Sequence, residues 1–286
     1  MEPIPPQPGS PGDPRHFVGR ARTTRIAEAR LSVGTNLALT DPRRMGKSSW
    51  LEHFCATTQN FDTVYVDYQG VRTCEEFLVR TATHLDRARS VPSKAKSALA
   101  SFFDNLGLQE VSAGPVKVKV GVHSMSPTAL LSNTVLAVDE HAIARPVLVC
   151  MDEVPWAIRN IAQREGPQAA SELLQTLRAL RHEAHQIRWI VCGSIGFHHV
   201  LRQCGATVGD INDLDSLPLG PLDLQEALEL AERLLLGARL RATEAAVSAL
   251  AERCGGIPFL LHKVASMLGD QAQDGRVDAP EVEKAF

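Results

Sequence analysis

The sequence has few cysteines and aromatic residues and no strong excess of charge of either sign. Its 286 residues include six cysteines with no CxxC pair, which disfavours both a disulfide framework and a zinc site. The formal net charge of -3 argues against a surface built mainly to neutralise nucleic-acid phosphates. No apolar run approaches the roughly 20 residues of a membrane span, and no signal-peptide pattern is seen. We therefore expect a cytoplasmic protein without a membrane partner.

The composition is that of a globular protein, with 44% hydrophobic and 22% charged residues. This length suits one large domain or a core with a smaller satellite. Residues 1–15 contain six prolines among glycine and serine. Because proline favours extended backbone and this stretch has few apolar groups to bury, we expect a disordered leader.

Four nearly continuous apolar runs predict buried strands, at residues 36–40, 63–68, 147–151 and 189–192. Stretches with helical spacing separate them, among them residues 171–185 with a stripe of four leucines at 173, 174, 177 and 180. This alternation is typical of a parallel sheet covered by helices on both faces. The expected fold class is therefore α/β. Residues 16–222 form the expected core, with 92–145 as an insertion that includes a short alternating run at 116–122. Residues 223–286 show no strand pattern and predict a small helical domain.

The first strand runs into the segment DPRRMGKSS at residues 41–49, which is followed by a helix. Strand, tight loop and helix N-terminus are the context of a phosphate-binding loop, because free N–H groups there hold anionic oxygens. Lys47 is predicted to reach the β- and γ-phosphates, and Ser48 to place its hydroxyl on Mg²⁺. Asp41 replaces the first glycine of the usual pattern. Aspartate tolerates the positive φ of that position, and Arg43 and Arg44 supply compensating charge beside it. If its carboxylate lies near the phosphates we expect it to oppose their binding, and the alternative is that it neutralises one of these arginines.

A phosphate loop of this kind needs an acidic residue at the end of a second strand to hold the water shell of the Mg²⁺ ion that accompanies the nucleotide. Two pairs are candidates, Asp152 with Glu153 and Asp139 with Glu140. The run before Asp152 is five apolar residues long and starts cleanly after a proline, whereas the run before Asp139 continues backward as a helix face. We therefore favour Asp152 as the metal-side carboxylate and Glu153 as the base that polarises water.

Five motifs occur in a fixed order: HFVGR at 16–20, DPRRMGKSS at 41–49, VLVCMDEVPW at 147–156, CGSIGFHHVL at 192–201 and GGIPF at 255–259. With these the chain resembles the P-loop ATPases of the AAA+/STAND group, especially the prokaryotic and archaeal-type ATPase modules. The resemblance implies a P-loop NTPase core with a C-terminal helical lid, and ATP or ADP with Mg²⁺ as cofactors. It also implies that Ser194 is a polar sensor near the γ-phosphate, beside Lys47 and Glu153 in the catalytic set.

The remaining implied residues contact the nucleotide. Residues 17–20 resemble an entry segment along the adenine, and Pro258 resembles a lid proline that closes over the nucleotide. The full implied set is Phe17, Val18, Gly19, Arg20, Arg43, Arg44, Met45, Gly46, Lys47, Ser48, Ser49 and Pro258, with Ser48 and Asp152 on the metal. Relatives usually continue into a winged-helix domain, which we expect another chain to supply if one is needed.

Some charged and metal-binding residue types are discounted. No arginine finger is identified, because surface charge is the expected role of Arg178, Arg181, Arg202 and Arg253. The histidine pairs at 182 and 185 and at 198 and 199 lack carboxylates or thiolates at ligand spacing, and we expect them to be structural or solvent-facing.

The motifs together predict an ATP-binding protein with slow Mg²⁺-dependent hydrolysis. Such a protein would act as a nucleotide-gated switch for assembly or signalling, with a protein partner or through self-assembly. Two alternatives stay open. One is a nucleotide-dependent DNA-binding or loading protein of the origin-recognition type, which salt-dependent duplex binding would reveal. The other is a nucleotide-binding scaffold without hydrolysis.

Overall fold

The computed structural model describes residues 2–9, 13–86, 126–141, 145–194, 197–204, 208–272 and 275–286. The chain divides into two compact units. The first, here called the α/β unit, comprises Ile26–Thr40 and Thr57–Leu217. The second, here called the helical unit, comprises Met1–Arg25, Asp41–Ala56 and Pro218–Phe286. The domain boundaries expected at residues 15 and 222 stay predictions.

The α/β unit alternates strands with helices along the chain. Its strands are β1 (Asn36–Leu39), β2 (Asp62–Asp67), β3 (Val147–Asp152), β4 (Ile187–Cys192) and β5 (Leu214–Ser216). Its helices are α3 (Cys74–Asp86), α5 (Pro127–His141), α6 (Val154–Glu165), α7 (Pro167–Glu183), α8 (Phe197–Cys204) and the 3-10 turn η2 (Val208–Ile211). Helix α1 (Ala21–Ser32) starts in the helical unit and ends in this one.

The strands form a five-stranded sheet in the order β2-β3-β4-β1-β5, and every pair is parallel. In register, Val149 lies beside Trp189, and Ile190 lies beside Leu37. The four predicted strands are confirmed. The sequence did not predict β5, because its three residues, Leu-Asp-Ser, carry no apolar run. All five carboxyl ends meet at one edge of the sheet, which is where parallel α/β sheets bind ligands.

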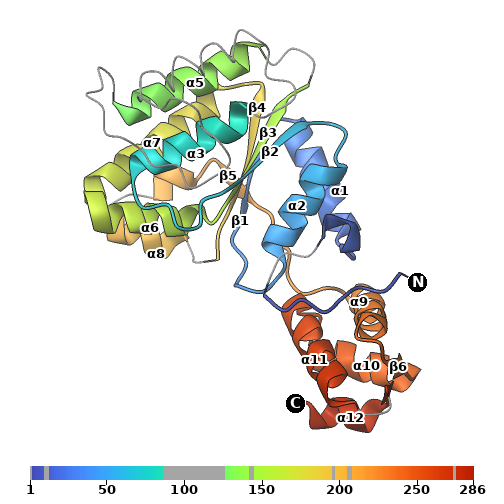
Figure 1. Ribbon diagram of the computed structural model, residues 1–286. Helices are drawn as coiled ribbons and strands as arrows, with labels where there is room; N and C mark the ends of the chain where they lie inside the picture. The colour runs from blue at the N-terminus through green and yellow to red at the C-terminus, as the bar shows by residue number, and fades with distance from the viewer. Residues whose placement is uncertain are drawn as a thin grey trace. The chain divides into compact units, whose positions relative to one another are not determined.

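Helices lie on both faces of the sheet, as the fold class predicts. Helices α3, α5, α6, α7 and α8 cover one face, and α1 lies on the other (Figure 1). Every residue of β1 and β3 is consequently buried. This double cover explains why those strands read as continuous apolar runs rather than alternating ones.

Helix α7 shows how the sequence pattern becomes packing. Its leucine stripe, expected from the helical spacing, is buried against the neighbouring elements: Leu173, Leu174, Leu177 and Leu180. Gly166, at φ 100°, separates α6 from α7, and Pro167 starts α7 at a position where no N–H is needed. Arg181 differs from the expected surface charge, because its side chain is 4% exposed and pairs with Asp213.

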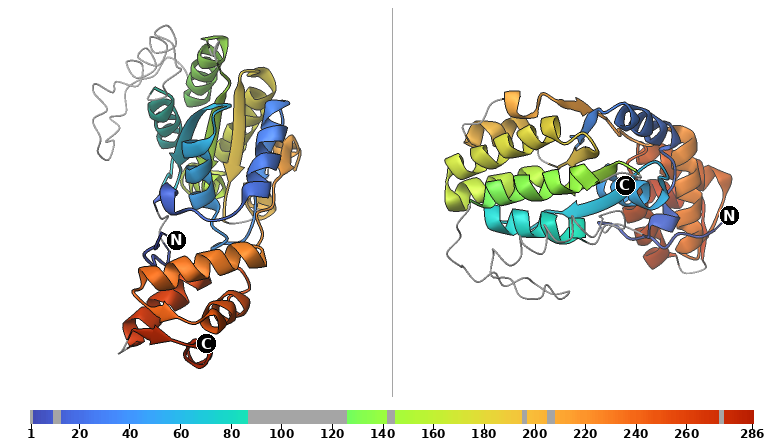
Figure 2. Two further views of the ribbon diagram at one scale, coloured as in Figure 1. Left: turned by 90° about the vertical axis from the view of Figure 1, so that its right-hand side faces the viewer. Right: turned by 90° about the horizontal axis from the view of Figure 1, so that it is seen from above.

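The helical unit also contains η1 (Pro14–His16), α2 (Lys47–Thr57), α9 (Leu224–Gly237), α10 (Glu244–Arg253), α11 (Pro258–Gln271) and α12 (Ala279–Lys284) (Figure 2). The last four helices pack around buried leucines such as Leu234, Leu250 and Leu261. A parallel pair of two-residue strands, β6 (Arg241–Ala242) and β7 (Arg276–Val277), joins the segments before α10 and α12. The expectation of no strands after residue 223 is therefore wrong in detail, since so short a pair leaves no periodic signal.

The insertion expected at residues 92–145 is described only in part. Its described segment includes α5, whose inner face buries Leu131, Val135 and Val138 in the α/β core. The alternating run at 116–122 lies outside the described residues. No helix in the described ranges is long and apolar enough to cross a membrane.

Candidate nucleotide site

The phosphate-loop segment joins β1 to α2, so the chain turns from the sheet edge directly into a helix N-terminus. Two residues of this segment have left-handed backbone, Arg44 at φ 76° and Gly46 at φ 81°. Gly46 meets this need without steric cost, whereas Arg44 is held there as a non-glycine residue. Asp41 has no positive φ, so the expectation that it takes the strained position of the loop is wrong.

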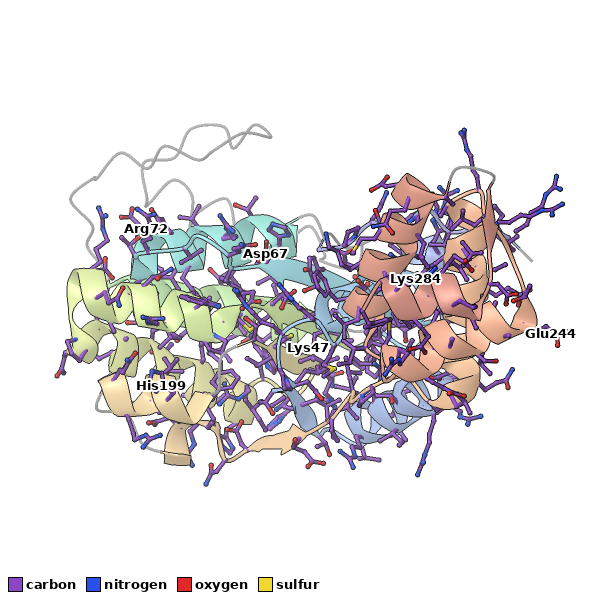
Figure 3. All side chains as sticks on the ribbon, turned by 90° about the horizontal axis from the view of Figure 1, so that it is seen from below. Lys47, Asp67, Arg72, His199, Glu244 and Lys284 are labelled. Atoms are coloured by element: carbon purple, nitrogen blue, oxygen red, sulfur yellow. The ribbon has the colours of Figure 1, made fainter. Side chains whose placement is uncertain are left out.

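Lys47 is the first residue of α2, and its long side chain folds back into the loop. The residue is 6% exposed, and Nζ donates to the carbonyl oxygens of Asp41 and, at 2.7 Å, of Pro42. Figure 3 labels Lys47 among the side chains. A buried ammonium held by loop carbonyls at a helix N-terminus places positive charge where the N–H groups of the first turn, including those of Ser48 and Ser49, also point.

The carboxylate of Asp41 is bound within the helical unit rather than left free beside the loop. Oδ2 accepts the N–H of Leu219 at 3.1 Å, and Oδ1 accepts the N–H of Gly220 at 2.9 Å. These bonds tie the start of the loop to the segment that precedes α9. The expectation that Asp41 mainly opposes phosphates is therefore corrected, because its charge is engaged by two backbone donors.

Arg20, in the entry segment, is a buried structural residue. It is 5% exposed, and its guanidinium donates to the carbonyls of Gly220 at 2.7 Å, Met45 at 3.3 Å and Leu219. Burial lowers the pKa of this group. Arg20 thus links the entry segment, the phosphate loop and the segment before α9.

The rest of the entry segment is shaped by close packing. Gly19 has left-handed backbone, at φ 79°, which favours glycine, and a Cβ there would lie 2.7 Å from the Glu226 carboxyl carbon, so the Glu226 side chain would have to shift. The same carboxylate accepts the N–H of Arg20 at 2.5 Å. Val18 is buried in the helical core, and Phe17 stacks on His53 of α2 with ring centroids 4.4 Å apart.

Pro258 begins α11 and lies near the loop. A Cβ added at Gly46 would sit 3.7 Å from Pro258 Cγ. The next residue, Phe259, lies under the guanidinium of Arg44, with 3.9 Å between Arg44 Cζ and the ring centroid. The loop and the start of α11 are thus neighbours within the helical unit, and the role of Pro258 as a lid proline stays a prediction.

The acidic residues form a second group, at the carboxyl end of β3 in the α/β unit. Asp152 is 3% exposed. Its Oδ2 accepts the hydroxyl of Tyr65, on the neighbouring strand β2, at 3.1 Å, and its Oδ1 accepts the N–H of Glu153 at 2.9 Å. These bonds fix the carboxylate at the sheet edge.

Glu153 directly follows β3 and has left-handed backbone, at φ 56°. Its Oε2 accepts the hydroxyl of Ser194 at 3.0 Å, and Ser194 Oγ in turn accepts the indole N–H of Trp156 at 3.2 Å. Strained backbone of this kind persists when the surroundings hold it and clusters at functional sites. The three residues form a hydrogen-bonded chain from Trp156 through Ser194 to Glu153.

Gly193 allows the hydrogen bonds among Trp156, Ser194 and Glu153 to form. A Cβ at this position would lie 2.4 Å from Pro155 Cδ and Cγ, so only glycine lets the end of β4 approach the start of α6. The N–H of Gly193 also donates to the carbonyl of Leu39, the last residue of β1, at 3.2 Å. The ends of β1, β3 and β4 are thereby held together at the sheet edge from which the phosphate loop departs.

The rival acidic pair lies at the end of a helix. Asp139 and Glu140 belong to the last turn of α5, and Asp139 Oδ1 accepts the N–H of Gln186. No strand precedes them, because the segment from Pro127 is helical. The structure therefore supports the assignment of the strand-end pair to Asp152 and Glu153.

The chemistry of the two residues predicted to hold a metal suits magnesium better than zinc. Ser48 in the helical unit offers a hydroxyl and Asp152 in the α/β unit offers a carboxylate oxygen, and each is a hard ligand of the kind that Mg²⁺ prefers. Within the described ranges no group of three or more histidine, cysteine or acidic residues could hold a metal by itself. The roles assigned to these residues remain predictions.

Four residues of this site escaped the sequence analysis. Tyr65 and Trp156 are ordinary aromatic residues in sequence, and only their hydroxyl and indole contacts show a role. Gly193 precedes Ser194 in the CGSIG motif, which was a usable signal. Glu226 is readable from sequence as the third residue of a capping box with Asp223, a pair that the structure forms.

Comparison with solved structures shows which known fold this structure matches. A Walker-type ATPase of Pyrococcus abyssi matches with a TM-score of 0.60 at 18% identity, covering 94% of this chain and 71% of that one. The chain has the fold of the P-loop AAA+ ATPases. No family profile and no curated protein match the sequence.

Two further solved structures match this fold. The ORC2 protein of Aeropyrum pernix, described as ADPNP-ADP complexes, matches with a TM-score of 0.54 at 15% identity, covering 94% of this chain and 68% of that one. The Cdc6p protein of Pyrobaculum aerophilum matches with a TM-score of 0.55 at 14% identity and the same two coverages. At these identities the likeness is one of AAA+ fold.

Proposed function

We propose that this AAA+ chain binds ATP with Mg²⁺, hydrolyses it slowly and acts as a nucleotide-gated switch. The observation that carries the proposal is the placement of Lys47, whose ammonium is held inside the loop at the N-terminus of α2. A positive charge and free helix N–H groups aimed at one place are what a nucleotide phosphate needs.

The order of the strands supports the same site. The loop follows β1 and the acidic residues follow β3, and both of these strands pair in parallel with β4, so their carboxyl ends lie at one edge of the sheet. Because β1 continues directly into the loop at residue 41, chain connectivity brings the loop to this edge. The description of the Aeropyrum pernix ORC2 structure, with its ADPNP and ADP, is consistent with a nucleotide as the ligand.

Each residue has a chemical task in this proposal. Lys47 and the first-turn N–H groups of α2 neutralise and orient the β- and γ-phosphates. Ser48 and Asp152 hold Mg²⁺, which when bound spreads the negative charge of the phosphates. Glu153 accepts a hydrogen bond from the attacking water and places it in line with the γ-phosphate.

Ser194 provides the switch. Its hydroxyl has one proton to donate, and in the structure that proton goes to Glu153. A γ-phosphate oxygen within reach competes for the same donor, which leaves Glu153 Oε2 with the weaker bond from the backbone N–H of Ser194, at 3.4 Å. Loss of the γ-phosphate restores the bond between the two side chains, so the site has two arrangements that depend on the nucleotide.

The phosphate loop is tested by Lys47→Ala. We expect the affinity for Mg-ATP, measured by calorimetry, to fall at least tenfold, about 1.4 kcal/mol, because the fixed cation of the loop is lost. Lys263→Ala is the matched control, since Lys263 is exposed on α11 and should leave affinity within twofold. Equal affinity in wild type and Lys47→Ala would exclude this loop as the phosphate site.

A nucleotide-dependent DNA-binding function is tested separately. The matches to ORC2 and Cdc6p structures favour testing it, whereas the net charge of -3 disfavours it. A DNA-binding protein should bind a labelled duplex with an affinity that falls steeply with salt. We expect no such binding in the presence of Mg-ATP at 150 mM salt, about the physiological ionic strength.

A further inference from the structure

Residues 2–9, here called the N-terminal segment, lie against the helical unit. The sequence leads one to expect a disordered leader, yet Ile4 is 3% exposed and belongs to the apolar cluster of α9, α10 and α11. The segment runs from the C-terminal end of α9 to the N-terminal end of α11 (Figures 1 and 2). An isoleucine buried to this extent contributes roughly 1.5–3 kcal/mol of apolar burial.

Polar contacts fix the segment along this path. The N–H of Ile4 donates to the carbonyl of Arg233 on α9 at 2.9 Å, and Arg233 Nε donates to the carbonyl of Glu2 at 2.9 Å. The N–H of Gln7 donates to Nδ1 of His262 on α11 at 3.1 Å. These bonds give the segment one direction and one register on the two helices.

Gly237, the last residue of α9, is shaped for this contact. A Cβ there would lie 1.9 Å from the carbonyl oxygen of Ile4 and 2.9 Å from the nitrogen of Pro5. Gly237 does not have left-handed backbone, so conformational freedom does not explain the glycine. Glycine inside a helix is less favourable than alanine, and the close approach of the Ile4 carbonyl accounts for it here.

The N-terminal segment has the composition of an extended ligand. Proline occupies positions 3, 5, 6 and 8, and each proline also restricts the residue before it to extended backbone. Such a segment loses little conformational entropy when it binds, and its solvated backbone donors remain available for recognition. One branched apolar side chain, that of Ile4, supplies the anchor.

We propose that α9 and α11 form a binding groove for extended, proline-flanked peptides with a branched apolar anchor, and that the N-terminal segment fills it in cis. The ligand class follows from what the groove holds: a buried isoleucine, two backbone N–H donors and a carbonyl packed on Gly237. The residues that hold the segment, Arg233, Gly237 and His262, are not among those assigned to the nucleotide, and the proposal does not depend on the proposed ATPase function.

The test uses the full chain and a labelled synthetic peptide with the sequence of residues 1–10. Ile4→Asp removes the cis anchor, so the groove should accept the peptide. We expect fluorescence anisotropy to show at least tenfold tighter peptide binding by Ile4→Asp than by wild type, whose own segment competes at a high effective concentration. A peptide carrying aspartate in place of isoleucine should not bind.

The groove itself is tested by adding Gly237→Ala to Ile4→Asp. The new Cβ meets the peptide carbonyl, so peptide affinity should fall at least tenfold. Gln225→Ala, an exposed position on the same helix, is the matched control and should leave affinity within twofold. Equal or absent binding by wild type and Ile4→Asp, or unchanged binding after Gly237→Ala, would overturn the groove.

A second measurement keeps the proposal testable if Ile4→Asp folds poorly. In the otherwise wild-type chain, Gly237→Ala should displace the segment, so exchange of the Ile4 amide should accelerate at least tenfold and Tm should fall. In the Ile4→Asp background the same change should raise Tm, because alanine favours the helix and no carbonyl opposes it. If Gly237→Ala changed Tm in the same direction in both backgrounds, the contact between Gly237 and the Ile4 carbonyl would be refuted. A wild-type dimer that dissociates on Ile4→Asp would refute the cis assignment.

Discussion

Ser194 donates its hydroxyl to Oε2 of Glu153 at 3.0 Å, although the two residues are 41 positions apart in the sequence. The bond links the end of β4 to the residue after β3, and Trp156 supports it by donating to Ser194. In the proposed function this bond is the element that responds to the γ-phosphate, so the first predictions concern Glu153 and Gly193.

Glu153→Gln should separate binding from hydrolysis. Glutamine keeps the size and polarity of the side chain but removes the charge that orients the attacking water. We expect ATP affinity to stay within a few-fold while turnover falls by about 10²-fold, the scale of a positioned general base. Calorimetry and a phosphate-release assay measure the two quantities.

Glu140→Gln is the control for this prediction. Glu140 is exposed at the end of α5, so its replacement should leave turnover within about twofold. If Glu140→Gln abolished hydrolysis while Glu153→Gln did not, the catalytic assignment would be wrong. No turnover above buffer in the wild type would instead favour the scaffold without hydrolysis.

Gly193→Ala should destabilise the α/β unit. The added Cβ would lie 2.4 Å from the Pro155 ring, and such overpacking costs about 1–3 kcal/mol in the free energy of unfolding. Urea unfolding measures this loss. Adding Pro155→Ala removes the two ring atoms that clash, so the double variant should recover part of it, whereas strictly additive losses would contradict the contact.

Asp41→Ala should destabilise the helical unit. The carboxylate accepts two backbone N–H bonds, from Leu219 and Gly220, and their loss leaves both donors without this partner. We expect the free energy of unfolding to fall by about 1–3 kcal/mol. Asp270→Ala, at an exposed position near the end of α11, should change it by less than about 0.5 kcal/mol.

Asp41→Gly distinguishes the two roles considered for this residue. If Asp41 mainly repelled phosphates, glycine would tighten ATP binding. Because the structure shows the carboxylate bonded to the segment before α9, we expect glycine to weaken ATP binding instead, with the loop less firmly held. Tighter binding by calorimetry would restore the repulsive role.

His262 should make stability depend on pH. Burial lowers its pKa from 6.5 to about 4, and its Nδ1 must be unprotonated to accept the N–H of Gln7. As pH falls below 6.5 the unfolded chain gains this proton before the folded one. The contribution is therefore complete above pH 6.5 and is lost between pH 6.5 and 4, by about 3 kcal/mol in total.

His262→Gln removes this titration. Between pH 7.5 and 5, the wild type should lose about 2 kcal/mol more unfolding free energy than the variant, as measured by urea unfolding at each pH. The same pH dependence in both proteins would show that His262 is not buried in its neutral form. The proton resonances of the ring give its pKa directly as an independent check.

Much of the fold was predictable because local patterns carried it. Continuous apolar runs predicted β1 to β4, and the leucine stripe predicted α7, since strands buried on both faces and amphipathic helices each leave a periodic signal. The pair β6 and β7 and the three-residue strand β5 are too short for any period. Their positions depend on partner segments that are distant in sequence.

The sequence by itself determined the kind of site: a GKSS segment between a strand and a helix, and an acidic pair after an apolar run. Only the tertiary structure decided the partners of those residues. It bonded Asp41 to two backbone amides, Ser194 to Glu153 and Ile4 to α9. The physical reason is that motifs and periodicity act over a few neighbouring residues, whereas these hydrogen bonds join residues 41 to 229 positions apart. Such residues come together only when the unit that contains them folds.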